Sequence, residues 1–371
     1  METLAWIAIA LGAGSLLRTV RALVRLRPWL RGGRVRDFVA GATPPMSVLK
    51  PVYGDEPRLT ENLTATLAQN YPDFEVLFLH ERENDPALAA VEAARAAITD
   101  VDTRVLEGAE TDAANPKVGT VLRGEAAAKH DILVVADADA EVDPLWLRDI
   151  AHALEDADAA AFVPVYAGAT TWFGRVVSLL KNTDGVMTAM VGAGDRLSGA
   201  TIAVKRPALE RVGGWRAVKD AMADDAAMGA ALYKSGAKLA LARRAQRVGI
   251  PDVDLAHVLR RLRTMRSAAP GPYLLGLVAS FTPLLLLTAA VFAGSAIATA
   301  MLVVHALVRV ELAISMDLRF ARDGATIRAL PSLPLLWFLE PAFAVIGLFG
   351  SEVTWRGRQF RVQNGSATLV A

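Results

Sequence analysis

The most constraining feature of this chain is a run of 42 residues, Ser267 to Val308, without an aspartate, glutamate, lysine or arginine. A helix that crosses a bilayer needs about 20 apolar residues, so the run is long enough for two crossings. We therefore expect two membrane spans, Tyr273 to Gly294 and Ala296 to Met316. The arginines that follow, between Asp317 and Arg328, favour the cytoplasm for that flank.

A shorter apolar run, Leu4 to Leu17, lies near the N-terminus and reaches bilayer length if it continues to about residue 26. Seven arginines follow Leu17 before the first acid, Asp37. A cleaved signal peptide carries its positive charge ahead of the apolar run, so residues 1–26 are interpreted as an uncleaved anchor. By the positive-inside rule, the arginines place the C-terminal flank of this anchor in the cytoplasm. An interfacial amphipathic helix remains the alternative.

A third apolar run, Leu330 to Gly350, is interrupted by Glu340-Pro341. A full crossing would place the basic residues 351–371 on the side that the positive-inside rule disfavours. A re-entrant or interfacial segment, with Glu340 paired inside protein, is equally compatible with the pattern. The sequence therefore predicts a C-terminal membrane region, residues 271–350, and a basic tail, residues 351–371.

The composition excludes some functions. The formal net charge is +1, which gives no reason to expect nucleic acid as a partner. The chain has no cysteine, so disulfides and thiolate metal sites are excluded.

Residues 43–266 have the pattern of an α/β domain. Short apolar runs predict strands, and helix-like stretches lie between them. Alternation of this kind predicts a parallel sheet covered on both faces, with ligands beyond the carboxyl ends of the strands. The expected strands are Met46 to Lys50, Phe74 to His80, Asp131 to Ala136 and Ala159 to Val165; the expected helices are Pro57 to Gln69, Pro86 to Ile98, Lys117 to Lys129 and Pro144 to Glu155.

The sharpest local signal is the apolar strand that ends in Asp137-Ala138-Asp139. Alternation along a strand points the two carboxylates the same way, toward the ligand crevice. Such a pair can hold a hard divalent cation that bridges a diphosphate, and one acid can also reach the nucleotide. Alternatively, Asp137 caps the following turn and Asp139 is solvated.

Asp224 and Asp225 open a helix-like run. An acid here can act as the general base that takes a proton from an attacking hydroxyl. Acids are also favoured in a first helical turn by the helix dipole, and from this pattern alone capping is the better interpretation.

Two basic features complete the candidate site. Lys117 stands at a helix N-terminus, where a bound diphosphate or a plain surface position would explain it. Arg260, Arg261, Arg263 and Arg266 precede the first C-terminal span, where they can clamp a pyrophosphate or contact anionic headgroups.

The segment Trp172 to Met190 carries apolar residues at spacings compatible with one helical face, Leu179 and Met187 among them. We expect this face to lie in the headgroup region and to admit a lipid acceptor. An ordinary core helix is the alternative.

Taken in order, these pieces resemble the ceramide glucosyltransferase branch of the family-2-type glycosyltransferases, close to the bacterial hopanoid glycosyltransferases. The resemblance covers nearly the whole chain, and its spacing is more specific than any one piece. The matching pieces are Ser47 to Gly54, Gln69 to Val76, Asn84 to Ala87, Asn115 to Lys117, Asp137 to Asp139, Leu197 to Gly199, Asp224-Asp225 and Trp355 to Arg358.

The resemblance implies a glycosyltransferase-A (Rossmann-like) fold, an inverting mechanism, a UDP-sugar donor and a lipid hydroxyl as acceptor. Asp225 would then be the base, and Asp139 would hold Mg²⁺ or Mn²⁺. By the resemblance, nucleotide-sugar contacts would come from Glu81, Glu83, Asp137 and Arg260, and Gly199 would lie near the acceptor. The local patterns described above add Lys117 and Arg261 to the nucleotide-sugar contacts, and Trp172, Leu179 and Met187 to the acceptor contacts. The resemblance also implies a catalytic domain on the cytoplasmic face, in an integral protein of a bacterial inner membrane.

The sequence departs from the family pattern at the (Q/R)xxRW motif. His257 stands for Gln/Arg and Arg261 for Trp, while Arg260 keeps the arginine. Glutamates occupy the region of the family's first aspartate, Glu81 to Glu83, and Ala226 follows the predicted base. Because that tryptophan shapes the acceptor end of the pocket, these changes bear on the identity of the acceptor.

The expected function is transfer of a hexose, glucose by preference, from a UDP-sugar to a lipid hydroxyl such as that of ceramide. The alternatives are a hopanoid N-acetylglucosaminyltransferase and a degenerate, non-catalytic membrane scaffold.

Overall fold

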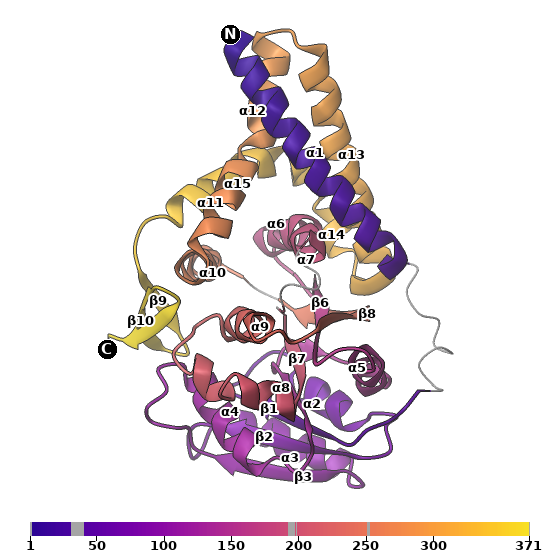
Figure 1. The fold of residues 1–371 in the computed structure, drawn as a ribbon, viewed down its shortest axis with the longest axis vertical. Coiled ribbons are helices and arrows are strands. Elements are labelled where there is room, and N and C mark those ends of the chain that lie inside the picture. The colour runs from indigo at the N-terminus through magenta and orange to yellow at the C-terminus, as the bar shows by residue number, and fades with distance from the viewer. Residues whose placement is uncertain (1, 31–40, 192–196, 198, 251–252, 371) are drawn as a thin grey trace.

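The structure is a computed structural model that describes residues 2–30, 41–191, 197, 199–250 and 253–370. It has three parts: a bundle of apolar helices, an α/β domain and a small sheet near the C-terminus (Figure 1).

A sheet of eight strands forms the centre of the α/β domain as described, in the order β3-β2-β1-β4-β7-β6-β8-β5. The first four strands along the chain pair in parallel, as predicted. The strands are β1 Met46–Pro51, β2 Phe74–His80, β3 Asp102–Glu107, β4 Ile132–Ala136, β5 Ala140–Glu141, β6 Ala159–Ala167, β7 Thr201–Lys205 and β8 Leu239–Gly249.

The prediction of an all-parallel sheet is wrong, because β7 runs antiparallel to both of its neighbours, β4 and β6. The helices between β6 and β7 pack against the membrane helices instead of crossing the sheet to start a parallel strand. They are α6 Trp172–Leu180, the π-helix η2 Lys181–Gly185 and α7 Val186–Val191.

Strand alternation divides the buried side chains between two helical layers. Val48, Phe78 and Val134 face a layer of α2 Leu59–Leu67, α3 Ala87–Ala97 and α5 Trp146–Leu154. Leu49 and Val135, each one residue further along its strand, face the opposite layer. That layer contains α4 Pro116–Ala127, α8 Arg206–Arg211, η3 Trp215–Val218 and α9 Asp224–Lys234. The period of two thus places helices on both faces, as expected.

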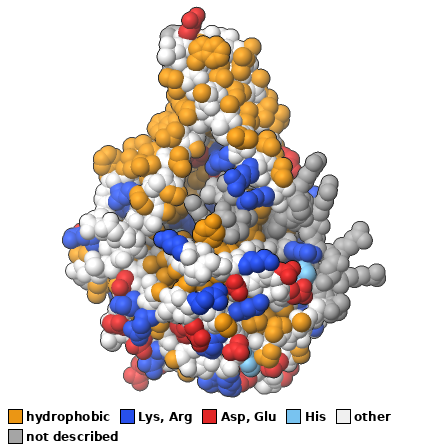
Figure 2. Space-filling model, viewed as in Figure 1, with side chains coloured by type: hydrophobic (Ala, Val, Ile, Leu, Met, Phe, Trp, Pro, Cys, Tyr) orange, Lys and Arg blue, Asp and Glu red, His pale blue; other side chains and the backbone are white. Residues whose placement is uncertain are grey.

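Three described helices are long and apolar enough to cross a membrane: Ala5–Leu26, Pro270–Phe292 and Ala296–Ala321. They belong to α1 Glu2–Leu30, to α11 Pro270–Ser280 with α12 Thr282–Phe292, and to α13 Ala296–Met316 with the π-helix η4 Asp317–Ala321. Helices α1, α12 and α13 lie side by side at one end of the molecule. Figure 2 shows hydrophobic side chains over this end and charged ones over the α/β domain, as a membrane-embedded bundle requires.

The third apolar run forms α15 Leu333–Ile346, preceded by α14 Ala325–Arg328 and η5 Leu330–Ser332. With 14 residues, α15 is about 21 Å long, too short for a hydrocarbon core of about 30 Å. It packs against α10 Leu255–Ala268 and α11. The expected internal partner of Glu340 is Arg309 of α13, at 2.6 Å. These features favour the re-entrant or interfacial arrangement over a full crossing.

The predicted basic tail is folded as a three-stranded antiparallel sheet: β9 Glu352–Trp355, β10 Arg358–Gln363 and β11 Ser366–Leu369. Its core is Val353, Phe360, Val362 and Ala367. Two-residue turns join the strands, and both residues of each turn have positive φ: 49° and 73° at Arg356-Gly357, 51° and 82° at Asn364-Gly365. Asn-Gly between alternating residues is a strong hairpin signal.

Candidate active site

Asp137 and Asp139 lie just beyond the carboxyl end of β4, where the sheet rule predicts a ligand site. Lys117 contacts Asp137 at 2.6 Å and Asp224 at 2.8 Å, so its ammonium group joins the strand end to the first turn of α9. Burial opposes the charge of Lys117, but the two carboxylates outweigh burial and raise its pKa. Three residues singled out in the sequence are thus brought together by one ion-pair network.

The contacts of Lys117 match neither of the two explanations offered by the sequence, a bound diphosphate or a surface position. Its side chain is neither on the surface nor dependent on a bound anion, because two carboxylates balance it. The preceding Asn115 caps α4, accepting hydrogen bonds from the backbone N–H groups of Lys117 (3.0 Å) and Val118 (3.3 Å). Its side-chain amide also donates to the carbonyl of Ala221 at 2.7 Å. The Asn-Pro-Lys piece therefore ties α4 to the segment that leads into α9.

A second lysine, Lys50 at the end of β1, was not singled out in the sequence. It is fully buried and donates to the backbone oxygen of Asp137 at 2.6 Å. Burial lowers the pKa of Lys50 to about 8, against the opposing attraction of Asp139, Asp137 and Glu56. Lys50 therefore fixes the position of the strand end and adds positive charge beneath the acid pair.

Asp139 has the surroundings of a cation ligand. Its Oδ1 atom is buried and has no hydrogen-bond partner among the described residues. Burial, together with repulsion by Asp137 and Glu56, raises the pKa of Asp139 to about 7. No group of three or more His, Cys, Asp or Glu residues suited to a metal ion occurs in the described part of the chain. Mg²⁺ is often held by only one or two carboxylates plus substrate phosphates, so the donor set fits such an ion.

Asp225 is placed by a backbone group from another loop. Its Oδ2 accepts the N–H of Gly199 at 2.9 Å, and no side-chain capping bond is present at the start of α9. Gly199 has φ of 133°, and a Cβ atom there would lie 2.9 Å from the carbonyl oxygen of Phe162. Only glycine suits this position, and its N–H orients Asp225. This contact gives the predicted acceptor residue Gly199 a positioning role; Ser198, beside it in the matched piece, lies outside the described residues.

A cluster of basic side chains from η2 and α10 stands near these acids. Asn182 of η2 holds the backbone of Tyr166 through bonds of 2.8 and 2.9 Å, which places the Lys181 ammonium 4.1 Å from the centroid of the Tyr166 ring. Arg261 also hydrogen-bonds Tyr166, and its pKa is raised by Tyr166 and, against burial, by Asp225. Tyr166 and Lys181 therefore link the predicted Arg261 to the acid side of the site.

The basic cluster concentrates positive charge. Burial lowers the pKa of Lys181 well below its usual value, and Arg261 and Arg260 lower it further against the attraction of Asp139. Burial, followed by Lys181 and the two arginines, lowers the pKa of His257 to about 4, so this imidazole is neutral at pH 7. No carboxylate forms an ion pair with Lys181, Arg260 or Arg261 among the described residues. Such a cluster is suited to a multiply charged anion.

The helical segment expected to admit lipid is packed on the predicted face. Leu179 is buried against Ala313 and Leu336 of α13 and α15. Met187 is buried against α1 and α13, next to Leu26 and Leu312. These two side chains therefore hold the α/β domain to the membrane helices, as in the core-helix alternative. Trp172, at the start of α6, is 57% exposed and remains available to a lipid.

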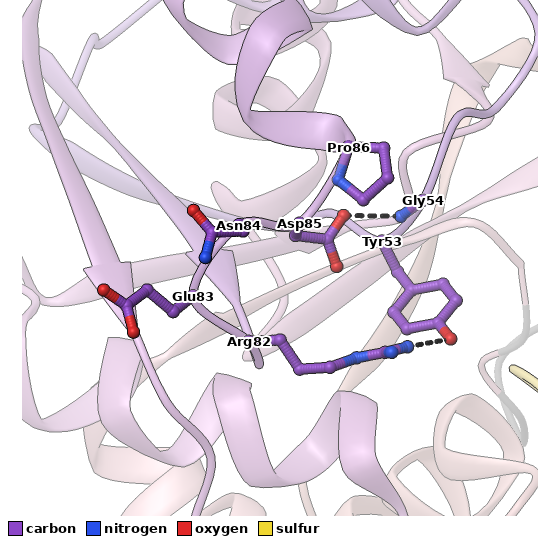
Figure 3. A pocket seen from close by; sticks show the side chains of 7 residues that line it. All are labelled: Tyr53, Gly54, Arg82, Glu83, Asn84, Asp85 and Pro86. Carbon is purple, nitrogen blue, oxygen red and sulfur yellow. Dashed lines mark hydrogen bonds between the residues drawn. The ribbon is translucent and has the colours of Figure 1, made fainter.

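A cleft of about 350 Å³, which Figure 3 shows from close by, lies beyond the carboxyl ends of β1 and β2. Strand β4, which leads to Asp137, pairs with β1. Its lining is Tyr53, Gly54, Arg82, Glu83, Asn84, Asp85 and Pro86. Asp85 holds the cleft together by accepting the Gly54 N–H at 2.7 Å and the Ala87 N–H at 3.0 Å. Ligand pockets run from roughly 300 Å³ upward, so the cleft is large enough for part of a small ligand.

Of the two predicted glutamates, only Glu83 lines this cleft. Glu81 instead forms an ion pair of 2.7 Å with Arg358 of the C-terminal sheet. The same sheet brings Arg356 within 4.7 Å of the Tyr53 ring centroid. From the sequence, Trp355 to Arg358 were expected only as part of the basic tail and of the family resemblance.

The described residues combine a mixed α/β sheet, an acid pair at a strand end, a tethered carboxylate and adjoining apolar helices. This is the arrangement expected for the glycosyltransferase-A fold class. The profile of glycosyl transferase family 21 matches residues 6–368, and the chain belongs to that family.

Curated relatives agree with the family. The chain is similar to ceramide glucosyltransferase 1 of Caenorhabditis elegans, 25% identical over 215 residues, which covers 53% of this chain and 44% of the relative. It is 33% identical over 97 residues to the ceramide glucosyltransferase of Komagataella phaffii, covering 25% of this chain and 19% of that protein. The chain thus spans less than half the length of these relatives.

Among solved structures, the fold is similar to that of a mannosyltransferase from Pyrobaculum calidifontis in complex with GDP-Man and Mn²⁺. The TM-score is 0.55 at 22% identity, with 93% of this chain and 99% of that chain covered. This likeness confirms the predicted glycosyltransferase-A fold.

Proposed function

We propose that this enzyme transfers a hexose, glucose by preference, from a UDP-sugar to the hydroxyl group of a membrane lipid such as ceramide, with inversion at the anomeric carbon. The observation that carries the proposal is the meeting of Asp139, Asp225 and the basic cluster beside α10, which leads directly into the apolar helix α11. Chemistry for a diphosphate and access to a bilayer are thus found in one place.

Each group has a role in the proposed reaction. Asp225, oriented by the Gly199 N–H, takes the proton from the acceptor hydroxyl as its oxygen attacks the anomeric carbon. Asp139 would hold Mg²⁺ or Mn²⁺, which when bound neutralises the diphosphate. Lys181, Arg260 and Arg261 stabilise the departing UDP, which receives the bonding electrons of the broken glycosidic bond. Lys117 positions Asp137 and Asp224 around the nucleotide.

The membrane arrangement supports a lipid acceptor. The relatives carry the name ceramide glucosyltransferase. Trp172 is exposed at the start of α6, and the next residue, Phe173, contacts Phe343 of α15. An acceptor with a long apolar part stays in the bilayer while its hydroxyl reaches Asp225. We place the catalytic domain on the cytoplasmic side because the arginines that follow α1 and α13 favour that side. The resemblance to the bacterial hopanoid glycosyltransferases supports a bacterial inner membrane.

The test is product analysis with the purified chain in nanodiscs. UDP-glucose, UDP-N-acetylglucosamine and GDP-mannose are each offered with ceramide, a hopanoid polyol and a native lipid extract, with Mg²⁺ or Mn²⁺ present. We expect a glycolipid and UDP from the pair UDP-glucose and ceramide. Transfer of N-acetylglucosamine to the hopanoid would favour the alternative substrate pair, and no transfer with any pair would favour the non-catalytic scaffold.

A further inference from the structure

The C-terminal sheet is attached to the catalytic domain on two sides. Ala367 donates its N–H to the carbonyl of Asp220 at 2.7 Å, and Ser366 forms a β-bridge with Ala221, close before the predicted base. On the other side, Arg358 pairs with Glu81 at 2.7 Å, beyond the end of β2. The sheet is therefore attached both to the segment that leads into α9 and to the loop after β2, which lines the cleft of Figure 3.

Arg356, at the tip of the β9–β10 turn, is the residue that this arrangement delivers to the site. Tyr53 donates its hydroxyl hydrogen to the Arg356 carbonyl at 3.0 Å. The Arg356 guanidinium carbon lies 4.7 Å from the ring centroids of both Tyr53 and Trp355. The first residue of such a turn is usually asparagine or glycine because its φ is positive, here 49°. A role for the side chain explains an arginine at this position.

The guanidinium group is close to acids but bonded to none. Burial lowers the pKa of Arg356, while Glu56, Asp137 and Glu81 oppose the change. No hydrogen bond or ion pair from its side chain to another described residue is formed, in contrast to Arg358 and Arg361 of the same sheet. The group lies against two aromatic rings, and its N–H groups remain for a ligand. Guanidinium groups favour phosphate oxygens because two parallel N–H groups match them.

The order of the neighbouring groups indicates which part of a ligand Arg356 would meet. Tyr53 lines the cleft, and its ring is contacted by Arg82 at 4.8 Å and by Arg356 at 4.7 Å. Arg356 also interacts with Asp137, at the end of β4, and with Glu56. A nucleoside in the cleft would bring its diphosphate toward the end of β4, where Arg356 also lies. We propose that Arg356 binds the diphosphate of the nucleotide-sugar donor, so that the C-terminal sheet forms one wall of the donor site. This inference rests on the proposed function.

The test compares a phosphorylated ligand with an unphosphorylated one. Binding of UDP and of uridine to the full chain in detergent is measured by calorimetry with Mg²⁺ present. Arg356→Ala should bind UDP about 10- to 100-fold more weakly, because a charge-assisted hydrogen bond is lost. Its affinity for uridine should change about threefold or less. The matched control is Arg361→Ala on the same sheet, an exposed arginine paired with Glu352, which should leave both affinities unchanged.

Because the chain has no cysteine, charge can also be restored chemically. Arg356→Cys provides a single thiol; an aminoethyl methanethiosulfonate adds a cation to it, and methyl methanethiosulfonate adds a neutral group. We expect the cationic reagent alone to recover UDP affinity. Equal weakening of UDP and uridine, an unchanged UDP affinity in Arg356→Ala, or equal effects of the two reagents would overturn the inference. Failure of the unsubstituted chain to bind UDP would instead refute the proposed function.

Discussion

Replacement by asparagine is expected to affect activity at Asp225 and stability at the neighbouring Asp224. Asp224 is buried and held by Lys117 at 2.8 Å, whereas Asp225 accepts one N–H, from Gly199, at 2.9 Å. Asparagine keeps the shape of aspartate, so loss of the negative charge is the main change in each variant. The pair therefore separates catalysis from stability.

The contacts set the expected magnitudes. In Asp225→Asn the amide oxygen still accepts the Gly199 N–H, so the free energy of unfolding should change by less than about 1 kcal/mol. Because an amide cannot take the proton, transfer should fall about 10²–10⁴-fold. In Asp224→Asn, Lys117 loses one of its two carboxylates and keeps Asp137 at 2.6 Å, which should lower the free energy of unfolding by about 1–3 kcal/mol.

The measurements are denaturant unfolding in detergent, calorimetric UDP binding and glycolipid formation with a labelled UDP-sugar. Asp225→Asn should unfold like the unsubstituted chain and bind UDP, yet form almost no product. If it kept activity within tenfold of the unsubstituted chain, Asp225 would not be the base. If it were destabilised as much as Asp224→Asn, the capping interpretation of the Asp-Asp pair would be correct.

Three further sets of substitutions test other parts of the structure. Asp139→Ala should abolish turnover and weaken UDP binding with divalent cation but not in a chelator; equal binding losses in both buffers would refute the metal role. Leu179→Ser and Met187→Ser, in packed positions, should each lower the free energy of unfolding by about 3 kcal/mol; a selective rise of KM for lipid would restore the acceptor prediction. Arg309→Met should cost about 3–5 kcal/mol because it leaves Glu340 buried without its partner and Asp184 with Arg18 alone, and adding Glu340→Gln should recover the part that comes from Glu340.

Local pattern was sufficient for the four predicted strands, the four predicted helices between residues 57 and 155, and the carboxylates at the end of β4. Those features depend on apolar periodicity and on the place where a strand stops. Strand β8 was not predicted, although it lies inside the sheet, because Arg243, Arg244 and Arg247 interrupt its apolar pattern. The direction of β7 depends on helices α6 and α7 binding membrane segments, which no local pattern records.

Contacts between residues far apart in the chain were the main feature that the sequence pattern could not predict. Lys50 is 87 positions from Asp137, and Tyr53 is 303 positions from Arg356. Neither spacing repeats, so periodicity contains no trace of the pairing. The turn Asn364-Gly365 was visible in the sequence and would have predicted a hairpin there. Its effect on the site still depends on how the sheet docks, through Asp220 and Ala221.

The π-helix η2 connects the membrane bundle to the chemistry. Lys181, its first residue, reaches the Tyr166 ring, and Asp184 on the same five-residue element pairs with Arg309 of α13 and, at 3.4 Å, with Arg18 of α1. A π-helix shifts the side chains that follow it by one position relative to an α-helix, and such turns are frequent at functional sites. A shift of α13 would therefore act on Asp184 and, through this short rigid element, on the lysine that neighbours the basic cluster. The membrane bundle and the basic cluster are thus joined through one element of five residues.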